Sequence, residues 1–85
     1  MAYTIAFAPS AERDFRKLPR AVQLRLSPHI DGFARNPRPP GATKLKGAEN
    51  AWRIRVGDFR ILYEIHDRIL LVLVVRVAHR REVYR

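Results

Sequence analysis

The sequence predicts an α+β fold in which an N-terminal strand and two helices precede a mostly antiparallel strand set that forms one sheet. Three observations predict it. Apolar residues alternate near the N-terminus and again in the second half, a helical pattern lies between them, and a Gly-Asp pair joins two of the later strands. The length of 85 residues predicts one domain, residues 1–85, with a thin core.

The first 19 residues predict a strand and then a helix. Apolar side chains alternate with smaller ones over residues 3–7, as in a half-buried strand. Pro9-Ser10 ends this strand and begins a helix, with Ser10 as the predicted N-cap. Pro19 closes the helix, whose apolar stripe consists of Ala11, Phe15 and Leu18.

A second helix is predicted from Arg20 to about Arg35. Ser27-Pro28 interrupts its pattern, either as a kink or as the start of a new helix. The residues after it, NPRPPGAT at 36–43, form a loop by composition. The predicted buried face of the helix consists of Val22, Leu26, Ile30 and Phe33.

Three strands are predicted in the second half, at residues 51–56, 59–65 and 69–77. The last, ILLVLVVRV, is apolar on both faces until Arg76, which is typical of a central strand. Gly57-Asp58, between the first two, is typical of a two-residue type II′ hairpin turn.

This turn fixes which residues share a face. Arg55 falls opposite Arg60, and Arg53 lies on their face. We expect Glu64 on the same face, paired with an arginine. The other face is predicted to be core and consists of Trp52, Ile54, Val56, Ile61 and Tyr63.

The charge indicates a polyanion as partner. There are 17 Lys and Arg against 8 Asp and Glu, a net charge of +9, and fourteen of the cations are Arg. Arginine matches phosphate with a planar fork and stacks on bases. Directly opposed arginines repel each other, which favours an anion between them. A solvated sheet face, with arginine kept for solubility, is the alternative.

The sequence lacks the residues that several other classes of site need. Without cysteine there is no disulfide and no thiolate ligand, and the three histidines lack metal-ligand spacing, so we predict no metal and no cofactor. No signal peptide is evident, and the longest apolar run is too short to span a bilayer. We therefore expect a cytoplasmic protein without a membrane partner.

The C-terminal residues add a candidate proton carrier. His79, Arg80 and Arg81 follow the last predicted strand, and Tyr84 comes four residues after Arg80. Histidine is the side chain whose ordinary pKa suits proton transfer near neutral pH. Together with the hairpin arginines, these groups suit cleavage of RNA by its own 2′-OH, which needs no metal.

The sequence resembles the RelE/ParE superfamily of bacterial and archaeal toxins, and more narrowly its RelE branch. The resemblance rests on KLKG (44–47), WRIRVGDFRILYEI (52–65), the apolar strand and HRREVY (79–84), and it covers nearly the whole chain. It implies a RelE-like, microbial ribonuclease-like fold and an mRNA endonuclease that acts in the ribosomal A site and inhibits translation. It also implies a cognate antitoxin as partner, with operator DNA contacted only through the antitoxin.

The resemblance also implies site residues. The catalytic set consists of Arg53, Arg55, Arg60, His79, Arg80 and Tyr84, and we expect RNA or ribosome contacts from Lys44, Lys46, Arg81 and Arg85.

One departure from the family pattern concerns the proton acceptor. Well-known members have lysine where this chain has Arg53 and Arg55, and arginine does not readily give up its proton. Either His79 is the base or charge stabilisation alone drives the reaction. Two alternatives stay open: a ParE-like inhibitor of DNA gyrase, and a catalytically weak toxin that acts mainly as the antitoxin-bound partner in a repressor.

Overall fold

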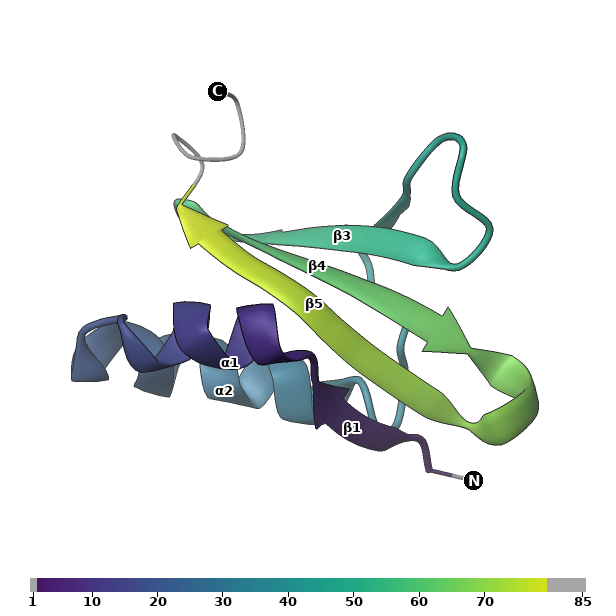
Figure 1. Ribbon diagram of the computed structural model, residues 1–85, viewed down its shortest axis with the longest axis horizontal. Coiled ribbons are helices and arrows are strands. Elements are labelled where there is room, and N and C mark those ends of the chain that lie inside the picture. The colour runs from purple at the N-terminus through teal and green to yellow at the C-terminus, as the bar shows by residue number, and fades with distance from the viewer. Residues whose placement is uncertain (1, 80–85) are drawn as a thin grey trace.

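The computed structural model describes residues 2–79, which form a five-stranded sheet with two helices on one of its sides (Figure 1). The spatial order is β1-β5-β4-β3-β2; β1 and β5 are parallel and the other pairs are antiparallel. The predicted α+β class and order are confirmed. The elements are β1 (Thr4–Phe7), α1 (Pro9–Arg16), α2 (Arg20–Gly32), β2 (Thr43–Lys44), β3 (Ala51–Val56), β4 (Phe59–His66), the 3₁₀ helix η1 (Asp67–Ile69) and β5 (Leu71–His79).

Strand β2 is absent from the predicted order. The prediction of a loop over residues 36–43 is wrong at its end, where Thr43 and Lys44 pair with Arg53 and Trp52. Two residues carry too little alternation to be recognised in a sequence.

Helix α1 begins two residues earlier than predicted. Ala8 is its N-cap, and Pro9 occupies the first turn, where a backbone N–H is not needed. The prediction of Ser10 as N-cap is therefore wrong. Its hydroxyl instead donates a hydrogen bond of 2.7 Å to the carbonyl of Val75 in β5.

Helix α2 continues through Pro28, so no new helix begins at Ser27, and it ends at Gly32 rather than Arg35. Gln23 joins the two helices, since its Nε2 donates to two carbonyls at the end of α1, those of Phe15 (2.9 Å) and Leu18 (3.2 Å). The Phe15 carbonyl also accepts the backbone N–H of Leu18 at 3.1 Å, so Gln23 reinforces the end of α1.

The core lies between the helices and one face of the sheet. Tyr63 is fully buried there, as predicted, and its ring stacks on Phe33 with centroids 4.2 Å apart. Its hydroxyl donates to the carbonyl of Pro37 at 2.8 Å. Burial raises the pKa of Tyr63 to about 12, so this phenol stays protonated near neutral pH. The fully buried side chains on this side include Leu26, Phe33, Ile61, Tyr63, Val72 and Val74.

A bulge in β5 reverses its side-chain alternation. Tyr63 pairs with Val74 but Leu62 pairs with Arg76, so Val75 is left without a partner in β4. One extra residue moves every following side chain to the opposite face. Arg76 therefore takes a register position on the face away from the helices, although its guanidinium reaches Asp14 of α1, and His79 lies on the core side.

Helix α1 holds this bulge where β1 has already ended. Ser10 satisfies the carbonyl of Val75, and Asp14 Oδ2 accepts both the backbone N–H of Val77 at 3.0 Å and Nε of Arg76 at 2.8 Å. Side chains of α1 thus replace the hydrogen bonds that a longer β1 would make.

A polar cluster ties the loop after α2 to the far end of the sheet. The carboxylate of Asp67 accepts hydrogen bonds from the Tyr3 hydroxyl (2.5 Å) and from two nitrogens of Arg38 (2.8 and 3.3 Å). These bonds, with Arg38 the larger cause, lower the pKa of Asp67. Arg38 also lies 5.2 Å from the ring centroid of Trp52.

Candidate functional site

Three arginines share the sheet face that neither helix covers, as predicted; we call it the arginine face, and its residues are Arg53, Arg55 and Arg60. The turn that aligns them is also confirmed. Gly57 has φ of 61°, and Asp58 is not among the described residues with positive φ, as a type II′ turn requires. The register sets Arg55 opposite Arg60 and Arg53 opposite Leu62.

The three guanidinium groups differ in their surroundings. Arg55 is exposed, and its Nε donates to the carbonyl of Gly57 at 2.9 Å. Arg53 is half-buried. Arg60 is only 8% exposed, and within residues 2–79 it is the one charged residue in the buried class. A charge held away from water acts more strongly on an ion beside it than an exposed one does.

Carboxylates do not neutralise the exposed part of this face. Glu64 lies on it, opposite Ala51, as predicted. The prediction that Glu64 pairs with an arginine is wrong, because its carboxylate lies 2.9 Å from Nε2 of His66. Within residues 2–79, Arg53 and Arg55 form no ion pair.

His79 does not lie on the arginine face. It pairs with Phe59, and the two rings meet edge to face with centroids 5.3 Å apart. The bulge puts it there, because an uninterrupted alternation from Leu71 would have brought it to the arginines. Its assignment as general base remains a prediction, and this position does not support it.

The other predicted site residues lie elsewhere or outside the described residues. Lys44 is exposed at the edge of the sheet, and its pairing with Trp52 puts it on the opposite face from Arg53. Lys46 is exposed in the following loop. Residues 80–85 lie outside the described part of the chain, so the roles of Arg80, Arg81, Tyr84 and Arg85 remain predictions.

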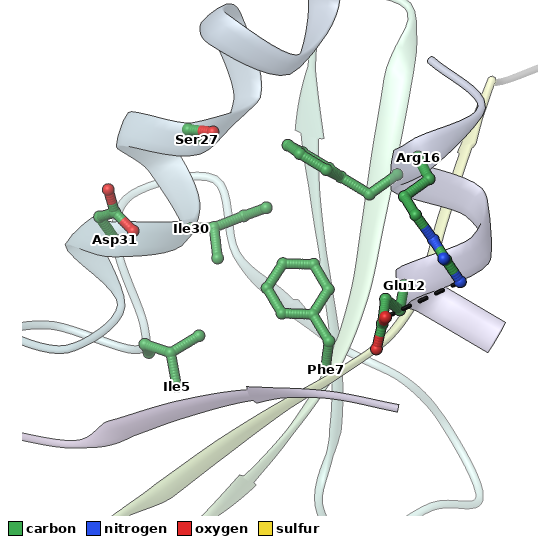
Figure 2. A pocket seen from close by; sticks show the side chains of 8 residues that line it. Ile5, Phe7, Glu12, Arg16, Ser27, Ile30 and Asp31 are labelled. Carbon is green, nitrogen blue, oxygen red and sulfur yellow. Dashed lines mark ion pairs between the residues drawn. The ribbon is translucent and has the colours of Figure 1, made fainter. Parts of the chain in front are cut away.

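The helix side carries an apolar pocket of about 430 Å³ between β1, α1 and α2, shown in Figure 2. Ile5, Phe7 and Ile30 lie around it, and Glu12 and Arg16 form an ion pair of 3.7 Å beside them (Figure 2). It lies on the other side of the sheet from the arginine face, so the two surfaces can serve different partners.

One cation near the hairpin was not predicted as a site residue. Arg25 reaches from α2 to the turn, where its Nη1 lies 3.3 Å from the position that a Cβ on Gly57 would occupy. The sequence did contain one signal for a site here: Arg25 precedes His29 by four residues, which puts both on one side of a helix. That spacing does not indicate which part of the protein the polar face of the helix contacts.

Two searches gave negative results for residues 2–79. They contain no group of three or more histidines and carboxylates placed to hold a metal ion. In the same part of the chain, no helix is both long and apolar enough to cross a bilayer.

The fold is that of a small toxin from a toxin–antitoxin system. Residues 5–84 match the family model described as the ParE toxin of the type II toxin–antitoxin system parDE, and the chain belongs to this family. Within the RelE/ParE superfamily it is RelE-like. Toxin RelG of Mycobacterium tuberculosis is 33% identical over 86 residues, covering 100% of this chain and 99% of the relative. The mRNA interferase toxin RelE of Escherichia coli K12 is 31% identical over 88 residues, covering 99% and 92%.

Solved structures agree with this assignment. The toxin–antitoxin complex RelBE2 from M. tuberculosis matches with a TM-score of 0.82 and 30% identity, covering 93% of this chain and 99% of that one. The isolated E. coli RelE toxin matches with a TM-score of 0.82 and 29% identity, covering 98% and 92%.

Proposed function

We propose that this toxin is a metal-independent endoribonuclease that cleaves mRNA in the ribosomal A site and so inhibits translation. The observation that carries the proposal is the opposition of Arg55 and Arg60 on an open sheet face, with Arg53 beside them. The name of the E. coli relative, an mRNA interferase toxin, supports the same activity.

The arginines supply charge stabilisation in this proposal. The 2′-oxygen gives up its proton and attacks the adjacent phosphorus, while the bond to the 5′-oxygen breaks and that oxygen leaves as a hydroxyl. Negative charge grows on the phosphoryl oxygens during this step, and guanidinium groups already in place stabilise it. Bound phosphate also relieves the repulsion between Arg55 and Arg60. Arg80 and Tyr84 are proposed to complete the site, and His79 stays the sequence-based candidate for the base.

A cognate antitoxin is the proposed protein partner. The E. coli and M. tuberculosis relatives have been solved with antitoxin RelB or in RelBE complexes. A net charge of +9 favours an acidic segment, and the pocket in Figure 2 offers space for apolar side chains of such a segment. Operator DNA would be reached only through the antitoxin.

Mapping mRNA ends after a pulse of toxin expression tests the activity. We expect cuts within translated codons, and loss of about 10²–10³ in rate for Arg60→Gln, the size seen when one charge-stabilising donor is removed. Arg68→Gln removes an exposed arginine from η1 and serves as the charge-matched control. Circular dichroism checks that both variants fold.

The second candidate, a ParE-like gyrase inhibitor, is favoured by the name of the matching family model. Growth arrest with intact mRNA and double-strand DNA breaks in the same pulse experiment would replace the nuclease with this function.

A further inference from the structure

A groove of about 400 Å³ lies beside β3, between that strand, the second half of α2 and the proline-rich loop. It opens where β2 no longer covers β3, since β2 pairs only as far as Arg53. No carboxylate lines it; the lining residues are Pro28, His29, Gly32, Asn36, Pro39, Pro40, Ile54 and Arg55.

Arg55 lines this groove, and Arg25 of α2, which does not line it, lies beside the same turn glycine, Gly57. Arg55 donates to the carbonyl of Gly57, and Arg25 Nη1 occupies the space beside the Cα of the same glycine. Asp58 is the nearest acid in sequence, yet within residues 2–79 neither Arg25 nor Arg55 forms an ion pair. Their charges are therefore available to an anion from outside the chain.

A ring lies one helical turn further along. His29 follows Arg25 by four residues, so both side chains emerge from the same side of α2. His29 is exposed and, with Pro39 and Pro40, supplies flat surfaces to the groove. Cationic groups at one end and flat rings along the wall suit a phosphate followed by its base.

We propose that this groove binds a nucleotide of single-stranded RNA that flanks the one on the arginine face. Arg25 contacts its phosphate and His29 stacks on its base. Arg55 belongs to both surfaces, so the strand passes over the uncovered edge of β3 from one to the other. The inference rests on the proposed function for its choice of ligand. A basic peptide is less well matched, because the groove offers it no carboxylate.

The test measures binding without cleavage. The purified full chain is titrated against a fluorescein-labelled 2′-O-methyl oligonucleotide, which lacks the attacking hydroxyl. We expect Arg25→Gln to weaken binding about fivefold and to reduce the slope of log Kd against log salt by about 0.7, as for one lost phosphate contact on a single strand. His29→Ala should weaken binding roughly tenfold with an unchanged slope, because stacking is uncharged.

Arg13→Gln is the matched control, since it removes an exposed arginine from α1, far from the groove. Equal effects of Arg13→Gln and Arg25→Gln, or no binding by the unmodified chain, would overturn the inference. So would variants that keep RNA affinity but lose affinity for the antitoxin, because the groove would then be a protein interface. If the chain binds RNA through Arg25 but leaves mRNA intact in cells, the inference about the groove stands and the proposed nuclease function is wrong. If the chain cleaves mRNA but Arg25→Gln and His29→Ala leave its RNA affinity unchanged, only the inference about the groove is wrong.

Discussion

Replacing Asp14 with alanine removes the group that holds the end of β5 to α1. One carboxylate oxygen accepts both the N–H of Val77 and Nε of Arg76. Losing the acceptor of a partly buried N–H costs about 1–3 kcal/mol. Losing a largely exposed ion pair costs about 0.2–1 kcal/mol more. The better helix propensity of alanine returns about 0.5 kcal/mol.

The expected net loss for Asp14→Ala is therefore about 2 kcal/mol, or about 2 M in the urea midpoint for an m-value near 1 kcal/mol/M. Asp14→Asn keeps an oxygen for Val77 and should lose only about 0.2–1 kcal/mol, the ion-pair share. Glu12→Ala is the control on the same helix, since its exposed pair with Arg16 spans 3.7 Å and should cost under about 0.5 kcal/mol. If Asp14→Ala is no more destabilising than Glu12→Ala, α1 does not anchor the bulge in the way described.

Two further predictions concern His79 and Asp67. Because His79 packs on Phe59 away from the arginines, His79→Gln should leave the cleavage rate and its pH profile unchanged and lower only the urea midpoint; a loss of about 10²–10⁴ in rate together with the acid limb would establish it as the base. The folded-state pKa of Asp67 lies below the unfolded value, so its stabilisation is complete above the unfolded pKa and is lost as pH falls through the folded one. Urea midpoints should therefore fall less steeply below about pH 4 in Asp67→Asn than in the unmodified chain or in Asp58→Asn, and three equal slopes would contradict the assignment.

The arginine face could be predicted because its geometry is local. A two-residue turn at Gly57-Asp58 fixes the register on both sides, so the opposition of Arg55 and Arg60 follows from counting. Tyr63 was placed in the core by the same count.

The position of His79 could not be predicted, because it depends on a distant contact. The bulge at Val75 is held by Ser10 and Asp14, more than sixty residues earlier in the chain. Nothing within β5 itself marks the extra residue, since Val74 and Val75 are identical side chains. The approach of Arg25 to Gly57 is hidden in the same way, because the packing of α2 against the sheet determines it.

Because side chains alternate along β3, residues that pack in the core and residues on the open face follow one another in the sequence. Ile54 and Val56 are buried among core side chains, whereas Arg53 and Arg55 stand on a face that the fold leaves open. Exchange of arginine for lysine at those two positions changes the cations on the open face and costs the scaffold little. Arg60 is the exception, because a buried cation has fewer acceptable replacements than an exposed one. The cations of β3 can therefore be exchanged at less cost to the fold than the buried cation of β4.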